Sequence, residues 1–214
     1  MIDEGYTKYQ CNWINSQPLS FDEIAELNKW RNKFYQLGLI GEYDNGIGFG
    51  NISIRYSPPG QFIVSGTQTG NLPTLDEQHY TRVTNFDLEK NFLTCCGPIQ
   101  ASSESLTHAT LYQANSTVNA VIHVHHLQLW QKLMYKVPTT AIDVAYGTPE
   151  MAKEILRLFR EDNLMQTKVV VMSGHEEGII SFGKNLEEAG NILLNKYNEL
   201  ILEKATRLRQ LSQY

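Results

Sequence analysis

Two histidines one residue apart, His123 and His125, are the best candidates for chemistry in this sequence. His123 lies in the apolar run 118–124, which is typical of a buried strand, and His125 directly follows it. Residues two apart on a strand point to the same face, so both imidazoles are able to reach one metal ion at about 2.0–2.1 Å. The alternative is a pair of partly buried histidines with ordinary hydrogen bonds.

Two further residues suit the same ion. His175 follows the apolar run 169–172 and is preceded by a glycine, so a loop could turn it towards a neighbouring strand. Glu104 opens a predicted helix, where the helix dipole alone would also explain a carboxylate. Three histidines and one glutamate would form a tetrahedral site suited to zinc (Zn²⁺), with other divalent metals as alternatives.

A second group of residues is suited to binding an anion. It comprises Asn51, Ser65, Gly66, Ser102 and Ser103, which follow a glycine-rich segment, end a predicted strand or precede a helix. Backbone N–H groups and hydroxyls in such places bind phosphate without a net positive charge. Each fragment alone is equally explained as a turn or a helix N-cap, and a carboxylate could replace the phosphate.

The hydrophobic pattern predicts the elements that must position these residues. Helices are expected over 21–37, 104–112, 126–134, 148–160 and 186–208, and strands over 51–56, 61–65, 81–86, 91–94, 118–124, 169–172 and 179–182. Residues 1–20 lack such a pattern and are expected to form an irregular N-terminal arm before one domain at 21–214. This mixture predicts an α/β fold with helices covering a central sheet.

Composition narrows the function further. The net charge is −5, from 18 basic and 23 acidic residues, so a general nucleic-acid binder is not expected. The N-terminus lacks the features of a signal peptide, and no apolar run approaches the length of about 20 residues that a membrane helix needs. The three cysteines show no zinc-finger spacing. We therefore expect a cytoplasmic protein with free thiols and no membrane partner.

Taken in order, the motifs resemble the class II aldolase and adducin family, whose members include fuculose-phosphate aldolases and ribulose-phosphate 4-epimerases. The matching segments are GFGNISIR (48–55), IVSG (63–66), ASSESLTHATLY (101–112), AVIHVHH (120–126), YGTPEMA (146–152) and SFGKNLEEAGNILL (181–194), together with the His175 loop. The resemblance implies a single-domain fold with a central, mostly antiparallel sheet between helical layers. It also implies a homotetramer with active sites between subunits.

The resemblance further implies a role for each candidate residue. His123, His125 and His175 would be the zinc ligands, and Glu104 a fourth ligand that becomes the acid/base when substrate displaces it. Asn51, Ser65, Gly66, Ser102 and Ser103 would bind the substrate phosphate. The implied activity is a zinc-dependent lyase that reversibly cleaves a phosphorylated sugar through an enediolate. Epimerisation or dehydration of a ketose phosphate at the same site is the alternative, and a non-catalytic adducin-like binding protein is a third.

The sequence also departs from the family pattern. The loop before the helix at 148–160 is short, and the second acid/base of the family has no aligned counterpart, which leaves Asp143 and Tyr146 as candidates. Glu176 and Glu177 stand where a glycine usually follows the third histidine. They are interpreted either as solvated loop charges or as part of the pocket.

Overall fold

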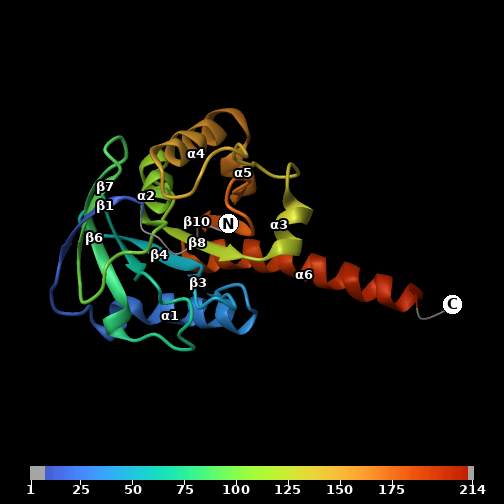
Figure 1. Cartoon of the computed structure of the whole chain (residues 1–214), viewed down its shortest axis with the longest axis horizontal. Coiled ribbons are helices and arrows are strands. Elements are labelled where there is room, and N and C mark those ends of the chain that lie inside the picture. Colours follow the sequence, from blue (N-terminus) through green and yellow to red (C-terminus); the bar gives the residue numbers. More distant parts are fainter. Residues whose placement is uncertain (1–7, 212–214) are drawn as a thin grey trace.

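The computed structural model describes residues 8–211, in which eight strands form one sheet (Figure 1). Their order across it is β1 (Gln10–Ile14), β7 (Phe92–Cys96), β6 (Tyr80–Asp87), β5 (Gln61–Ser65), β4 (Asn51–Tyr56), β8 (Ala120–His125), β10 (Gly178–Gly183) and β9 (Val169–Val171). Only the edge pair β1–β7 is parallel among these described strands, and the other neighbours are antiparallel. The expectation of a mostly antiparallel central sheet is confirmed.

Helices cover both faces of this sheet (Figure 1). One apolar core packs α1 (Phe21–Gln36), α3 (Leu127–Leu133) and α6 (Leu186–Leu211) on one face. The other core packs α2 (Ser105–Ala114), α4 (Pro149–Glu161) and α5 (Leu164–Thr167) on the opposite face. The alternation along β8 fits both cores, because Ile122 and Val124 face the first while Val121 faces the second.

A capping box at its start and a glycine after its end determine the boundaries of helix α1. The Glu23 carboxylate accepts a hydrogen bond of 2.8 Å from the backbone N–H of Ser20, as in a capping box. Gly38 follows the helix with φ +68°, a conformation that residues with a Cβ rarely adopt. The helix boundaries expected from this pattern, 21–37, therefore agree with the structure to within one residue.

The prediction of an irregular arm was wrong over Gln10–Ile14, which forms strand β1. Four of its five side chains are exposed and the fifth, Cys11, is partly buried, so its sequence lacks the apolar alternation of a half-buried strand. Its parallel register with β7 stabilises it through backbone hydrogen bonds to a distant segment. Such long-range pairing leaves little trace in local sequence.

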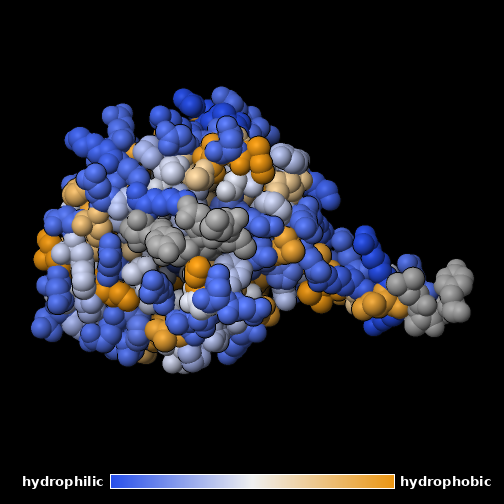
Figure 2. All heavy atoms as spheres, in the orientation of Figure 1, coloured by the Kyte–Doolittle hydropathy of each residue, from blue (hydrophilic) through white to orange (hydrophobic). Residues whose placement is uncertain are grey.

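Short elements were also absent from the sequence prediction. The glycine-rich segment contains the two-stranded pair β2 (Gly41–Glu42) and β3 (Gly48–Phe49), and a 3₁₀ helix, η1, covers Glu77–His79. Helix α6 extends beyond the body of the molecule (Figure 1). Apolar side chains remain exposed on this end, among them Leu202 and Leu208 (Figure 2). Within residues 8–211 no helix has both the length and the apolar character needed to cross a membrane.

Candidate metal and anion site

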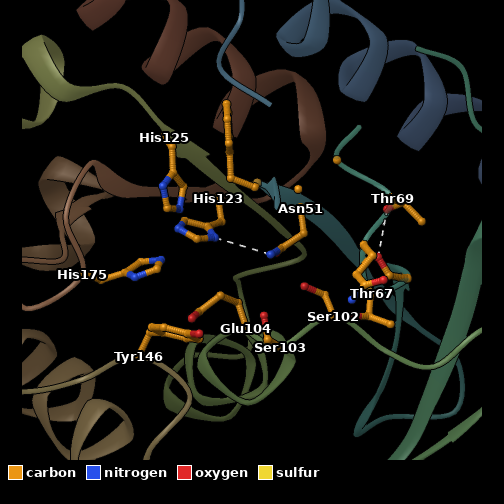
Figure 3. A pocket seen from close by; sticks show the side chains of 16 residues that line it. Asn51, Thr67, Thr69, Ser102, Ser103, Glu104, His123, His125, Tyr146 and His175 are labelled. Carbon is orange, nitrogen blue, oxygen red and sulfur yellow. Dashed lines mark hydrogen bonds between the residues drawn. The ribbon is translucent and has the colours of Figure 1, made fainter. Parts of the chain in front are cut away.

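The structure brings His123, His125 and His175 together on the α2 side of the sheet (Figure 3). One candidate ligand atom from each ring lies within 4.8 Å of the other two, and all three residues are buried. His123 and His125 come from β8, while His175 comes from the tight turn that precedes β10. Because Gly178 of β10 pairs with His125, this turn delivers His175 beside the β8 histidines. We call these three residues the histidine end of the pocket.

A hydrogen-bonded chain orients His125. Its Nδ1 lies 2.7 Å from the Tyr43 hydroxyl, which in turn donates to the Glu177 carboxylate over 3.2 Å. A carboxylate can only accept, so the hydroxyl oxygen is left to accept the Nδ1–H of His125. This tautomer leaves the lone pair on Nε2, the arrangement common among metal-bound histidines. Glu177 therefore has a partner next to the pocket, whereas sequence alone left its role open.

Asn51 is the residue next to Nδ1 of His123, as Tyr43 is for His125. Its side-chain amide lies 3.4 Å from His123 Nδ1, and Asn51 pairs with His123 across β4 and β8. Among the described residues, neither Asn51 Oδ1 nor His123 Nε2 has a hydrogen-bond partner. Rotation of the amide would let Oδ1 accept the Nδ1–H and leave the Nε2 lone pair for a metal ion.

Burial makes the three histidines neutral. It is the largest cause of the lowered pKa of all three, and it lowers that of His123 to about 3. Neutral imidazoles are the form that binds metal ions. Three buried nitrogen donors, one of them without a hydrogen-bond partner among residues 8–211, fit a borderline divalent ion such as zinc.

Glu104 lines the same pocket immediately before α2, but its carboxylate is outside the group of three ligand atoms. Oε2 accepts a hydrogen bond of 2.8 Å from the Thr107 hydroxyl, while Oε1 has no partner among the described residues. Burial raises the pKa of this carboxyl to about 7. A carboxyl of this kind is able to hold or release a proton near neutral pH.

The opposite end of the pocket is formed by residues 66–70, with the sequence Gly-Thr-Gln-Thr-Gly, and by Ser102 and Ser103 (Figure 3). We call this the loop end. The Thr69 hydroxyl donates to Gly66 O over 2.8 Å, and the buried Arg31 donates to Thr69 O and Gly70 O over 2.9 and 3.1 Å. These bonds hold the loop from beneath. Its backbone and the serines before α2 are the kinds of groups that bind an anion.

Not every predicted site residue reaches this pocket. Asn51, Gly66, Ser102 and Ser103 line it, as do Glu104 and the three histidines. Ser65 does not line it, and its hydroxyl accepts the N–H of Ile52 over 3.2 Å. Of the two candidates for a second acid/base, Tyr146 lines the pocket, with its ring centre 4.5 Å from that of His175. Asp143 is exposed and does not line it.

Sequence reasoning missed several residues of the site. The segment Thr67–Gly70 carried a usable signal, since glycines and threonines directly follow a predicted strand. Tyr43 and Arg31 carried none, because they contact the site from segments about 80 and 40 residues away. Only the fold shows that these positions contact or line the pocket.

Comparison with known proteins agrees with the fold. Residues 32–195 match the model of the family described as Class II Aldolase and Adducin N-terminal domain. The match includes the three histidines, Glu104 and the loop end.

Solved structures show the same fold. L-fuculose-1-phosphate aldolase from Thermus thermophilus is 20% identical, with a TM-score of 0.62 over 87% of this chain and 94% of that one. A sugar-phosphate aldolase from Thermotoga maritima is 17% identical, with a TM-score of 0.64 over 87% and 96% of the two chains. YgbL from Escherichia coli, described as a candidate aldolase, epimerase or decarboxylase, is 19% identical, with a TM-score of 0.60 over 81% and 84%.

Proposed function

Since this chain belongs to the class II aldolase and adducin family, we propose that it is a zinc-dependent lyase that reversibly cleaves a phosphorylated sugar. The observation that carries this proposal is the set of three buried, neutral histidines facing one point, with a buried carboxyl in the same pocket. His123, His125 and His175 would hold the ion. When bound there, the ion would polarise a carbonyl oxygen of the substrate as a Lewis acid.

The remaining residues supply binding and proton transfer in this proposal. Asn51 and the loop end, including Gly66, Ser102 and Ser103, would bind and orient the phosphate, which fixes the substrate relative to the reacting bond. Glu104, through Oε1, would move the proton at the carbon next to the carbonyl. Tyr146 would exchange a proton with the hydroxyl oxygen on the far side of the cleaved bond. Glu104 as a fourth metal ligand remains a prediction.

Epimerisation or dehydration of a ketose phosphate is the second candidate. Tyr146 is the one predicted second acid/base that reaches this chain's pocket, and all three reactions can pass through an enediolate of the substrate. One similar structure is itself described by several reaction classes. Product analysis by NMR separates them, because cleavage gives two fragments while epimerisation and dehydration conserve the carbon skeleton.

The decisive first experiment is metal analysis of protein purified without chelator or nickel resin. We expect about one zinc per chain in the wild type and none in His123→Ala. The control His79→Ala, which removes a histidine outside the pocket, should keep its zinc. Zinc-loaded protein is then incubated with a panel of phosphorylated ketoses. A wild type that binds no metal after zinc addition and dialysis would contradict the proposal and favour an adducin-like binding role.

We also propose that the protein assembles as a homotetramer whose sites lie between subunits. The exposed Leu202 and Leu208 on the extended end of α6 support an interface there, and Asp143 would be able to act only in a neighbour's site. Light scattering coupled to size exclusion should give four times the chain mass. A monomer at micromolar concentration would contradict this assembly.

A further inference from the structure

Lys8, two residues before β1, lies against Tyr146 next to the histidine end of the pocket, although it does not itself line the pocket. Its Nζ lies 4.0 Å from the centre of the Tyr146 ring, and that ring contacts His175. Tyr146 and His175 both line the pocket, so the ammonium is separated from a proposed metal ligand by a single aromatic ring.

Several hydrogen bonds hold this segment in place. The Asn91 side-chain amide donates to Lys8 O over 3.0 Å and to Gly147 O over 3.2 Å, so it ties Lys8 to the residue after Tyr146. The Tyr9 hydroxyl donates to Ala101 O over 2.7 Å and to Ser102 O over 3.1 Å. The pairing of β1 with β7 begins two residues later at Gln10. These bonds fix the backbone at Lys8 and at the residue that follows it.

The described side chains that line the pocket include no cationic group. Among the described residues that line it there is no lysine or arginine, while Glu104 contributes an acid. Arg31 lies beneath the loop end, where backbone carbonyls accept its donors, and so it serves that end alone. Cleavage of a sugar develops negative charge on substrate oxygens near the histidines, at the opposite end.

We propose that Lys8 provides the cationic side chain of the histidine end and stabilises negative charge on the ligand bound there. This inference rests on the proposed function, because it requires an anionic ligand held by a metal ion on the three histidines. It assigns a role at the site to the N-terminal segment, which the sequence predicted to be an arm before the domain. Lys8 would act by charge and not by proton transfer.

Two hydroxamates test the proposal by calorimetry on zinc-loaded protein. Acetohydroxamate chelates a metal and carries no phosphate mimic, while phosphonoacetohydroxamate adds a phosphonate. We expect Lys8→Met to reduce the affinity for both hydroxamates by a similar factor of about 5–20. Both probes bind at the histidine end, and a charge-assisted contact is lost there. Lys8→Arg should stay within about threefold of wild type. The matched control Lys153→Met, on the exposed face of α4, should bind both as wild type does.

Each other outcome overturns the inference in a recognisable way. If Lys8→Met binds zinc and both hydroxamates as wild type does, the inference fails while the proposed function stands. If Lys8→Met reduces only the affinity for phosphonoacetohydroxamate, Lys8 acts at the loop end and its assignment to the histidine end is wrong. If the wild type binds neither zinc nor hydroxamate, the proposed function fails and the inference fails with it. Zinc stoichiometry and melting temperature of each variant show whether it is folded.

Discussion

The two ends of the pocket are built in different ways. The histidine end consists of side chains whose positions follow from the register of β8 with β4 and β10. The loop end consists mainly of backbone and hydroxyl groups, and its shape depends on a buried arginine beneath it. Side-chain identity therefore specifies the first end, while backbone conformation specifies the second. Variants that disturb only one end should separate metal binding from anion binding.

Two glycines allow this separation, and they give the largest expected effects. A Cβ at Gly174 would lie 2.2 Å from Val144 O, and a Cβ at Gly70 would lie 2.5 Å from Gly41 O. Neither contact can be relieved without moving backbone. Gly174→Ala should displace His175 and reduce zinc affinity about 100-fold or more. Gly70→Ala should reduce zinc affinity far less, and it should abolish the higher affinity of phosphonoacetohydroxamate relative to acetohydroxamate.

Competition with a zinc chelator and calorimetry with both hydroxamates measure these effects. Circular dichroism and melting temperature serve as controls for folding, since both substitutions are close to backbone. If folded Gly70→Ala protein lost as much zinc affinity as folded Gly174→Ala protein does, the two ends of the pocket would not be separable.

The Tyr43 hydroxyl is a hydrogen-bond partner of one histidine of the cluster, His125. Tyr43→Phe removes the hydroxyl that contacts His125 Nδ1 while it leaves the ring that packs on Phe49. Loss of such an orienting partner typically costs 10–100-fold in metal affinity, so we expect a fall of about tenfold. Chelator competition measures it, and Tyr35→Phe on α1 is the matched control. An unchanged zinc affinity would show that the Glu177–Tyr43 chain does not orient His125.

Arg31→Lys tests the loop end. A lysine ammonium cannot reproduce the fork that donates to Thr69 O, Gly70 O and Pro73 O. We expect a loss of about 2 kcal/mol in the free energy of unfolding. The affinity for phosphonoacetohydroxamate should fall several-fold, while the affinity for zinc stays unchanged. Urea unfolding and calorimetry provide the measurements. Equal losses at both ends would indicate a general structural role for Arg31 in place of a local one.

Features that depend on local sequence could be predicted, whereas features that depend on contacts between distant segments could not. The grouping of the histidines with Glu104 and most regular elements could be predicted because their signals are local: spacing two on a strand, apolar periodicity and a capping box. Strand β1 and the contact of Tyr43 with His125 were missed because they depend on pairing between distant segments. Ser65 was assigned to the phosphate because its position after an apolar run is ambiguous, and only the sheet register shows that its hydroxyl bonds to Ile52.

Acidification should affect the metal-free protein through its buried histidines. Burial lowers the pKa of the three cluster histidines and of His108, so all four are neutral when folded and take up protons near pH 6.5 only when unfolded. The unfolded chain then binds more protons below that pH, and stability falls as pH falls. Glu104 acts in the opposite direction, because its pKa of about 7 lets the folded chain hold one proton that the unfolded chain releases. Four groups outweigh one, so urea unfolding in chelator should show a loss of about 1–2 kcal/mol between pH 7 and 6. Stability that stayed constant or rose over this interval would mean that the histidine end is open to water before metal binds.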